Sequence, residues 1–343
     1  MLFHLGTLWR LFELDLLKDA RCISSVSGGS ITAGAVALAW DRLDWTSTQS
    51  YVEMVVMPIR AMASRTIDIP AAGLGRFVWR DAGFWIERAY RRHLFGTATL
   101  QDLPSTTRFV INATNMHNGR LWRFSRPFMG DWRTCRIMDP DLPLARAVAA
   151  SSAFPPFLSP VTVAFDPASL VGGDGTNGSR AHARLTDGGV YDNLGLETVW
   201  KNYRTLLVSN GGGGLGDQAR PSRLWTLHAY RALSIIQDQV GALRTRQLIG
   251  GFKAPEDSLL WRGGAYFGIG DVLGEHHPTD ALPCPPARTA ALAATATRLK
   301  RLSKRHQEQL INWGYAVCDA QVRRFHQPHA TPPTGFPYSE AGV

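Results

Sequence analysis

The sequence predicts an α/β fold in which a mostly parallel central sheet lies between two layers of helices, a three-layer α/β/α sandwich. Short apolar runs typical of strands alternate with longer helical patterns along the 343 residues. Parallel strands are joined by crossovers that usually contain a helix, so this alternation favours a mostly parallel sheet. Hydrophobic residues make up 45% of the chain, which is ordinary for a globular core.

The first half of the chain supplies many of the expected elements. Helical patterns predict helices over 1–18, 29–40, 47–63 and 84–94. Apolar, β-branched stretches predict strands over 22–25, 108–114 and 121–124. The last two are expected to pair, because Asn118-Gly119 is a strong hairpin-turn signal. Aromatic and basic residues mix over 75–80 and Phe84-Trp85, which suits core packing or, less commonly, a lipid interface or the lining of an acyl pocket.

The second half continues the alternation and ends in a proline-rich tail. The expected elements are a helix over 144–152, a glycine-rich surface loop over 166–183, a strand over 206–209, a helix over 228–249 and an amphipathic helix through 299–317. Four prolines after residue 327 favour disorder. We therefore expect one domain over 1–327 and a disordered tail over 328–343.

Ser27 is the strongest candidate for a catalytic residue. It follows an apolar strand and precedes Gly28, Gly29 and a helical run of small residues. A serine on a sharp turn from strand to helix has the geometry of a nucleophile elbow. The two glycines remove side chains that would clash in such a turn, and the amides that begin the helix point toward developing negative charge.

Asp187 is the best candidate for the base that a serine nucleophile needs at neutral pH. It ends a short approach and is followed by Gly188 and Gly189, which suits a carboxylate at the carboxyl end of a strand. Asp192 is a weaker candidate, since it precedes a helical start and suits a turn or a helix cap. An α/β-hydrolase would add a later histidine such as His228 or His276, but 26 residues cannot supply the strands that precede its nucleophile.

These motifs, in this order, resemble the patatin-like phospholipase family, with a distant similarity to cytosolic phospholipases A2. The resemblance covers residues 1 to about 325 and includes three intermediate stretches, 101–104, 108–115 and 150–157. It implies a Ser27–Asp187 dyad without histidine that forms an acyl-enzyme from a lipid or phospholipid ester. Gly28 and Gly29 would belong to the elbow and oxyanion region, and Gly188 and Gly189 would support the base. Ser25 stands where the commoner elbow pattern has glycine, which raises the chance of strain at the turn.

Members of this family normally begin with a strand and a glycine-rich loop whose amides form the oxyanion hole, and neither precedes Ser27 here. We expect the coding sequence upstream of Met1 to supply them, and the printed chain alone to have little activity. The alternative is a catalytically inactive patatin-like relative that binds lipid or a protein partner.

The charge and the cysteine content of the chain indicate which partners and which location to expect. The net charge of +9 favours contact with anionic surfaces, and Arg298, Lys300, Arg301, Lys304 and Arg305 concentrate part of it near the carboxyl end. We expect a solvated basic face there or, as the alternative, peripheral contact with an anionic membrane, and no nucleic acid. Four scattered cysteines and the absence of a signal peptide favour a reducing, cytoplasmic location, and we expect no metal and no cofactor. The sequence leaves the oligomeric state open.

Overall fold

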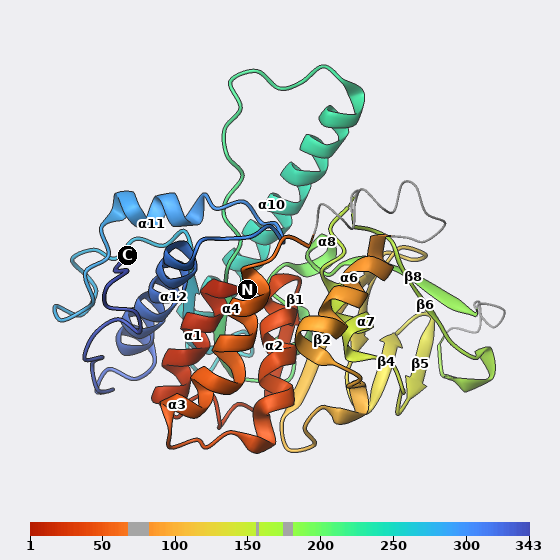
Figure 1. The fold of residues 1–343 in the computed structure, drawn as a ribbon, viewed down its shortest axis with the longest axis horizontal. Coiled ribbons are helices and arrows are strands. Elements are labelled where there is room, and N and C mark those ends of the chain that lie inside the picture. The colour runs from red at the N-terminus through yellow and green to blue at the C-terminus, as the bar shows by residue number, and fades with distance from the viewer. Residues whose placement is uncertain (68–81, 156–157, 174–180) are drawn as a thin grey trace. The chain divides into compact units, whose positions relative to one another are not determined.

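The computed structural model describes residues 1–67, 82–155, 158–173 and 181–343 (Figure 1). The chain forms two compact units. The first, here called the sheet unit, contains residues 19–198 and 298–302. The second, here called the terminal unit, contains residues 1–18, 199–297 and 303–343. The sequence predicted a single domain over 1–327.

An eight-stranded sheet dominates the sheet unit. Its strands are β1 (Cys22–Val26), β2 (Arg108–Asn115), β3 (Arg120–Phe124), β4 (Phe128–Asp131), β5 (Cys135–Met138), β6 (Val161–Ala164), β7 (Leu170–Val171) and β8 (His182–Asp187). The strand order is β6-β8-β2-β3-β4-β5-β7, and β1 also pairs with β2. The predicted hairpin is confirmed, since β3 runs antiparallel to β2.

The predicted mostly parallel sheet is wrong. In the larger sheet, β1 is parallel to β2, but the other pairs that the structure describes are antiparallel. The cause lies in the connections. The links from β3 to β4 and from β4 to β5 each leave three residues, 125–127 and 132–134, whereas a parallel connection needs a dozen or more.

The helices of the sheet unit occur largely where helical patterns predicted them. They are α2 (Gly28–Ala39), α3 (Thr48–Tyr51), α4 (Met57–Ala63), α6 (Ala82–Tyr90), α7 (Leu144–Ser151) and the short α8 (Gly189–Asp192), with α9 (Leu196–Trp200) at the unit boundary. Helix α2 is built almost entirely of small or apolar residues and is buried along most of its length. It packs on β1 and α7, and α7 packs on β2 and β8. Helix α2 therefore covers β1, which is itself a strand of the sheet.

The terminal unit contains α1 (Leu2–Glu13), β9 (Thr205–Asn210), α10 (Trp225–Lys253), β10 (Gly263–Gly268), α11 (Pro286–Ala293) and α12 (Lys304–Phe325). Strands β9 and β10 form a separate parallel pair. Helix α12 packs closely on α1 and on β10. Leu310, Trp313 and Val317 of α12 are buried, so the apolar stripe of this predicted amphipathic helix is part of the core.

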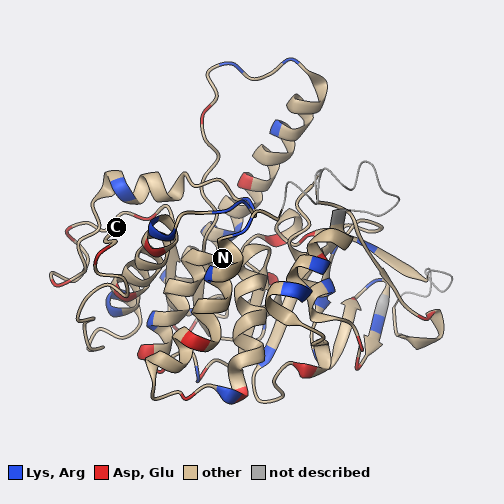
Figure 2. Cartoon of the chain, in the orientation of Figure 1, with Lys and Arg blue, Asp and Glu red and all other residues tan. Residues whose placement is uncertain are grey.

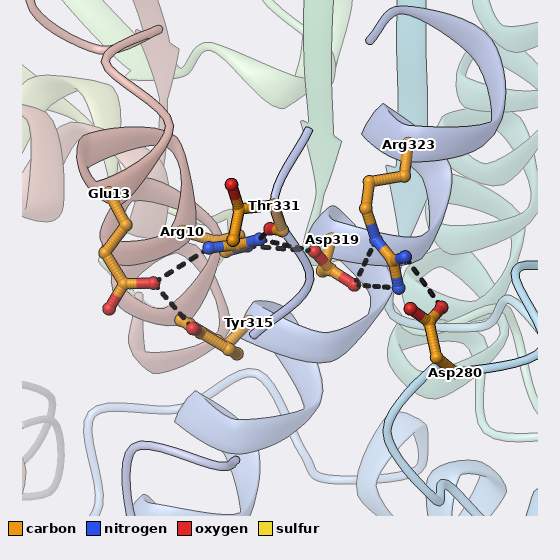
Figure 3. Close-up of polar contacts among 7 residues, drawn as sticks. All are labelled: Arg10, Glu13, Asp280, Tyr315, Asp319, Arg323 and Thr331. Atoms are coloured by element: carbon orange, nitrogen blue, oxygen red, sulfur yellow. Dashed lines mark hydrogen bonds and ion pairs between the residues drawn. The ribbon is translucent and has the colours of Figure 1, made fainter. Parts of the chain in front are cut away.

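A buried ionic network joins α1 to α12 (Figure 3). Arg10 contacts Asp319 at 2.8 Å and Glu13 at 3.1 Å. Asp319 also accepts a hydrogen bond of 3.0 Å from Arg323 Nε, and Arg323 Nη1 reaches Asp280 at 2.7 Å. Asp319 therefore lies between two arginines that are each less than a tenth exposed, and it neutralises their charge together with Glu13 and Asp280.

Three further regions bear on the sequence predictions. The expected tail, 328–343, packs on α12, where the Asn312 amide donates to the carbonyls of Tyr338 and Gly342 and where Val343 is buried. The aromatic and basic stretch 75–80 lies outside the described residues. The same holds for residues 174–180 of the glycine-rich loop, whose earlier part contains β7.

Candidate active site

Ser27 occupies a sharp turn between β1 and α2. Its backbone angles are φ 52° and ψ −126°, a region that residues with a side chain rarely adopt. Such a conformation persists only where the surrounding structure enforces it, and it is typical of a nucleophile elbow. The side chain is partly exposed, although the preceding residue, Val26, is buried. The turn therefore holds the hydroxyl clear of the core.

Two strands meet end to end on one edge of β2. Strand β1 runs parallel to β2 and places Val26 beside Asn112. Strand β8 runs antiparallel to β2 and places Asp187 beside Ala113. Strand β3 occupies the other edge over the same residues. The carboxyl ends of β1 and β8 therefore face each other, and the residues at these ends, Ser27 and Asp187, come together from 160 positions apart.

The Asp187 carboxylate is buried, with 1% of the residue exposed. Oδ1 accepts a hydrogen bond of 2.7 Å from the Gly189 amide. Oδ2 is buried without a hydrogen-bond partner among the described residues. Burial raises the pKa of Asp187 to about 6, although the Gly189 amide and an interaction with the Ser27 hydroxyl both lower it. Oδ2 is therefore the Asp187 oxygen that has no hydrogen-bond partner among the described residues.

The backbone of Asp187 is fixed on both sides. Its amide donates to the Ala153 carbonyl at 3.0 Å, and its carbonyl accepts a hydrogen bond of 2.9 Å from the Thr114 hydroxyl. A Cβ atom at Gly188 would clash with the Asn112 carbonyl. The glycine that follows Asp187 is thus required by a close approach of two backbones, and this approach holds the carboxylate at the end of β1.

Ser151 and Asn112 support the turn, and sequence reasoning gave them no role. The Ser151 hydroxyl accepts a hydrogen bond of 3.0 Å from the Ser27 amide and donates one of 2.6 Å to the Asn112 carbonyl. The Asn112 amide donates to the Ser24 hydroxyl and the Ser25 carbonyl, each at 2.9 Å. Both residues lie in stretches that carry the family resemblance, but their role depends on pairing that no local pattern reveals.

Gly28, Gly29 and Ser25 lie on either side of the Ser27 turn. Gly28 and Gly29 form the first turn of α2, where backbone amides lack acceptors within the helix. Ser25 lies in β1, and its hydroxyl contacts the Val110 carbonyl at 3.3 Å and the Ser30 hydroxyl at 3.1 Å. Its hydroxyl therefore finds partners in the packed strand.

Asp192 has the structural role that its sequence position indicated. It is fully buried, and its two carboxylate oxygens accept hydrogen bonds from the amides of Leu194 and Glu197, at 3.1 and 2.7 Å. This arrangement fixes the turn into α9. With both oxygens bound to backbone amides, the Asp192 carboxylate differs from that of Asp187, one oxygen of which has no hydrogen-bond partner in the described part of the chain.

The described residues contain neither a candidate metal cluster nor a candidate membrane-spanning helix. No three histidine, cysteine, aspartate or glutamate side chains in the described ranges gather closely enough to hold a metal ion. Among the helices of the described ranges, none combines the length and the apolar character that crossing a bilayer requires.

Comparison with known proteins identifies a family. Residues 1–200 match the profile of the family described as Patatin-like phospholipase, which is more than half of the chain. No curated protein matches the chain. The matched range contains β1, the Ser27 turn, β2 and β8 with Asp187, and therefore every candidate site residue.

Proposed function

The chain belongs to the patatin-like phospholipase family, and from this premise we propose that it hydrolyses the acyl esters of lipids with Ser27 as nucleophile and Asp187 as general base. The family suggests a lipid acyl hydrolase. The observation that supports the two roles is the meeting of β1 and β8 on one edge of β2, which brings a serine on a strained turn to a buried carboxylate.

The reaction begins with a proton transfer. Asp187 Oδ2 accepts the Ser27 hydroxyl proton while Ser27 Oγ attacks the ester carbonyl carbon. The resulting tetrahedral adduct collapses, the carbon–oxygen bond to the leaving alcohol breaks, and that alcohol takes the proton from Asp187. An acyl-enzyme remains. Asp187 then accepts a proton from water, the hydroxide attacks the acyl carbonyl, and the fatty acid leaves as the proton returns to Ser27.

The carboxylate has properties that suit a general base. A base works best when its pKa lies near the working pH, and burial raises the pKa of Asp187 to about 6. The carboxyl group is then mostly ionised at neutral pH and still basic enough to accept a proton in the transition state. The Gly189 amide holds Oδ1, so the proton is directed to Oδ2.

The beginning of α2 supplies positive potential beside the reacting carbonyl. Gly28 and Gly29 follow Ser27 directly, and the first amides of a helix carry its positive dipole end. Donors of this kind stabilise the negative oxygen of a tetrahedral adduct, and each is typically worth a hundred- to a thousand-fold in turnover. Because glycine has no side chain, the amides at these two positions stay accessible.

The test compares substitutions of Ser27 and Asp187 with the same substitutions at a serine and an aspartate outside the candidate site. The parent for this test is expressed from the complete reading frame, with any in-frame sequence upstream of Met1 included. In this parent, Ser27→Ala and Asp187→Asn should each reduce hydrolysis of a fatty-acyl p-nitrophenyl ester at least about a hundred-fold, and the double variant should be little worse because the residues act as a unit. The matched controls are Ser105→Ala, at an exposed serine, and Asp192→Asn, at a buried carboxylate that binds backbone amides. Both controls should retain hydrolysis.

A fluorophosphonate probe provides a second readout. It should label the parent chain on Ser27 and fail to label Ser27→Ala. Hydrolysis by Ser27→Ala at the parent rate would refute the assignment of the nucleophile. A folded parent chain that neither hydrolyses lipid esters nor reacts with the probe would instead favour the inactive, lipid-binding relative.

A further inference from the structure

The first two thirds of α10 and the loop before it expose apolar side chains. Within the terminal unit, this part of the chain extends away from the strands and the other helices (Figure 1). Residues 216–230 are exposed throughout. Trp225 is 75% exposed, Ile236 61% and Leu243 59%. We call residues 216–243 the α10 arm. A soluble protein rarely leaves so many large apolar side chains uncovered along one helix.

Three of these side chains share one face of the helix. Trp225 and Ile236 are 11 positions apart, and Ile236 and Leu243 are 7 apart. At 3.6 residues per turn these spacings are about three turns and two turns, so the side chains lie nearly in line. Asp238 falls on the opposite side of the helix. The arm thus has an apolar face with an aromatic residue near its end, which is the pattern of helices that lie in a membrane interface.

The charges of the arm have one sign over a long stretch. Between Asp217 and Asp238 the sequence contains Arg220, Arg223 and Arg231 and no acidic residue (Figure 2). Arg220 and Arg223 are exposed in the loop that leads into the helix. Arginine beside exposed apolar and aromatic side chains complements an anionic lipid surface, where each basic residue near the head groups strengthens binding. The same charges disfavour packing two arms side by side.

The basic stretch 298–305 lacks the apolar half of such a surface. Arg298, Lys300, Arg301, Lys304 and Arg305 are exposed. The apolar residues that follow them on α12 are buried against the rest of the terminal unit. Charge alone gives weak attraction that salt screens. The α10 arm exposes both basic and apolar side chains, whereas this stretch exposes only the basic ones.

We propose that the α10 arm docks the protein on anionic lipid membranes, with the face of Trp225, Ile236 and Leu243 among the acyl chains and Arg220 and Arg223 at the head groups. The inference rests on the proposed function, since a lipid hydrolase must meet its substrate at an interface. It concerns residues outside the Ser27–Asp187 site, and it assigns to the arm the membrane contact that the sequence analysis gave as the alternative for 298–305.

The experiment measures cosedimentation of the full chain with vesicles of phosphatidylcholine and a rising fraction of phosphatidylglycerol. All proteins carry Ser27→Ala, so that binding is measured without hydrolysis and independently of the role of Ser27. Binding should rise with phosphatidylglycerol and fall with salt. Trp225→Gln, Ile236→Gln and Leu243→Gln combined should weaken binding at least about tenfold. Arg220→Gln with Arg223→Gln should weaken it about fivefold for each arginine at low salt.

Two control variants match these changes in kind. Leu259→Gln, Leu260→Gln and Val272→Gln replace three other apolar side chains of the terminal unit, which are 95%, 65% and 59% exposed. Lys304→Gln with Arg305→Gln removes two charges from the basic stretch. Both controls should bind vesicles within about twofold of the parent.

Three results would overturn the proposal. The parent could fail to bind anionic vesicles, or the apolar α10 variant could bind them as the parent does. Alternatively, light scattering could show a parent dimer that the apolar variant converts to a monomer while vesicle binding is unchanged, which would make a second copy of the chain the occupant of this face. The arginine pair lies in a loop, so its effect does not depend on the stability of the helix.

Discussion

Asp187→Asn should make the protein more stable at neutral pH while it removes activity. Burial raises the pKa of this carboxyl from 3.8 to about 6, so the folded protein favours the protonated form. The stability that this preference contributes is fully present below pH 3.8 and is lost as the pH rises through about 6. Near pH 7 the folded protein therefore holds a buried carboxylate at a cost, and asparagine, which has similar shape and no charge, removes that cost.

The magnitude follows from the two pKa values. The difference between 3.8 and about 6, at 1.36 kcal/mol per unit, amounts to about 3 kcal/mol at pH 7. At pH 5 the same linkage leaves about 1.5 kcal/mol, because the folded protein is then mostly protonated. The asparagine carbonyl can still accept the hydrogen bond from Gly189, which the Asp187 Oδ1 atom accepts in the parent. We therefore expect a gain of up to about 3 kcal/mol that shrinks as the pH falls.

Urea unfolding of the parent and of Asp187→Asn at pH 7 and pH 5 measures this gain. Asp192→Asn is the matched control, and it should lower the free energy of unfolding. Both Asp192 oxygens accept hydrogen bonds from backbone amides, and asparagine offers only one acceptor oxygen. Hydrolysis by the parent should fall about tenfold per pH unit below pH 6, as the base becomes protonated. A less stable Asp187→Asn protein at pH 7, or a parent rate that is flat between pH 7 and pH 5, would refute the reasoning.

Two further predictions concern the terminal unit. Asp319→Ala should lower the free energy of unfolding by about 3–5 kcal/mol, because Arg10 and Arg323 then lose the carboxylate between them; a loss below about 1 kcal/mol in urea unfolding would contradict the network. Gly314→Ala should also destabilise the protein, because its new Cβ would meet an α1 carbonyl, whereas Gly241→Ala in α10 meets nothing within 4 Å and should be neutral or stabilising by about 0.5–1 kcal/mol. Equal thermal midpoints for these two glycine variants would contradict the close packing of α1 on α12.

Local patterns predicted the elements that depend on neighbouring residues. Strand β1 and helix α2 follow from an apolar run, a serine with two glycines and a stretch of small residues. The β2–β3 hairpin follows from Asn118-Gly119, since this pair favours the tight turn that antiparallel strands need. A sharp turn at Ser27 was expected for the same reason, because the strand, the two glycines and the helix that signal it lie within a few positions of Ser27.

Nonlocal pairing explains what the sequence could not predict. Strands β4 and β5 are four residues each and include Asp131 and Arg136, so they lack the apolar run that marked other strands. Without them, the alternation of strands and helices looked like that of a parallel sheet. Ser151 and Asn112 are ordinary residues in their local sequence, and they support the Ser27 turn only because α7 and β2 pack beside it.

The error in the predicted fold and the meeting of the two candidate site residues in the structure have a common origin. Strand order along the chain suggested that Asp187 ends a strand, which holds whichever way β8 runs. Only an antiparallel β8 lets its carboxyl end face that of β1 on one edge of β2. A shift of β8 by one residue would turn the Asp187 side chain to the other face of the sheet. The close contact of Gly188 with the Asn112 carbonyl opposes that shift, so the sheet register itself brings the candidate base to the candidate nucleophile.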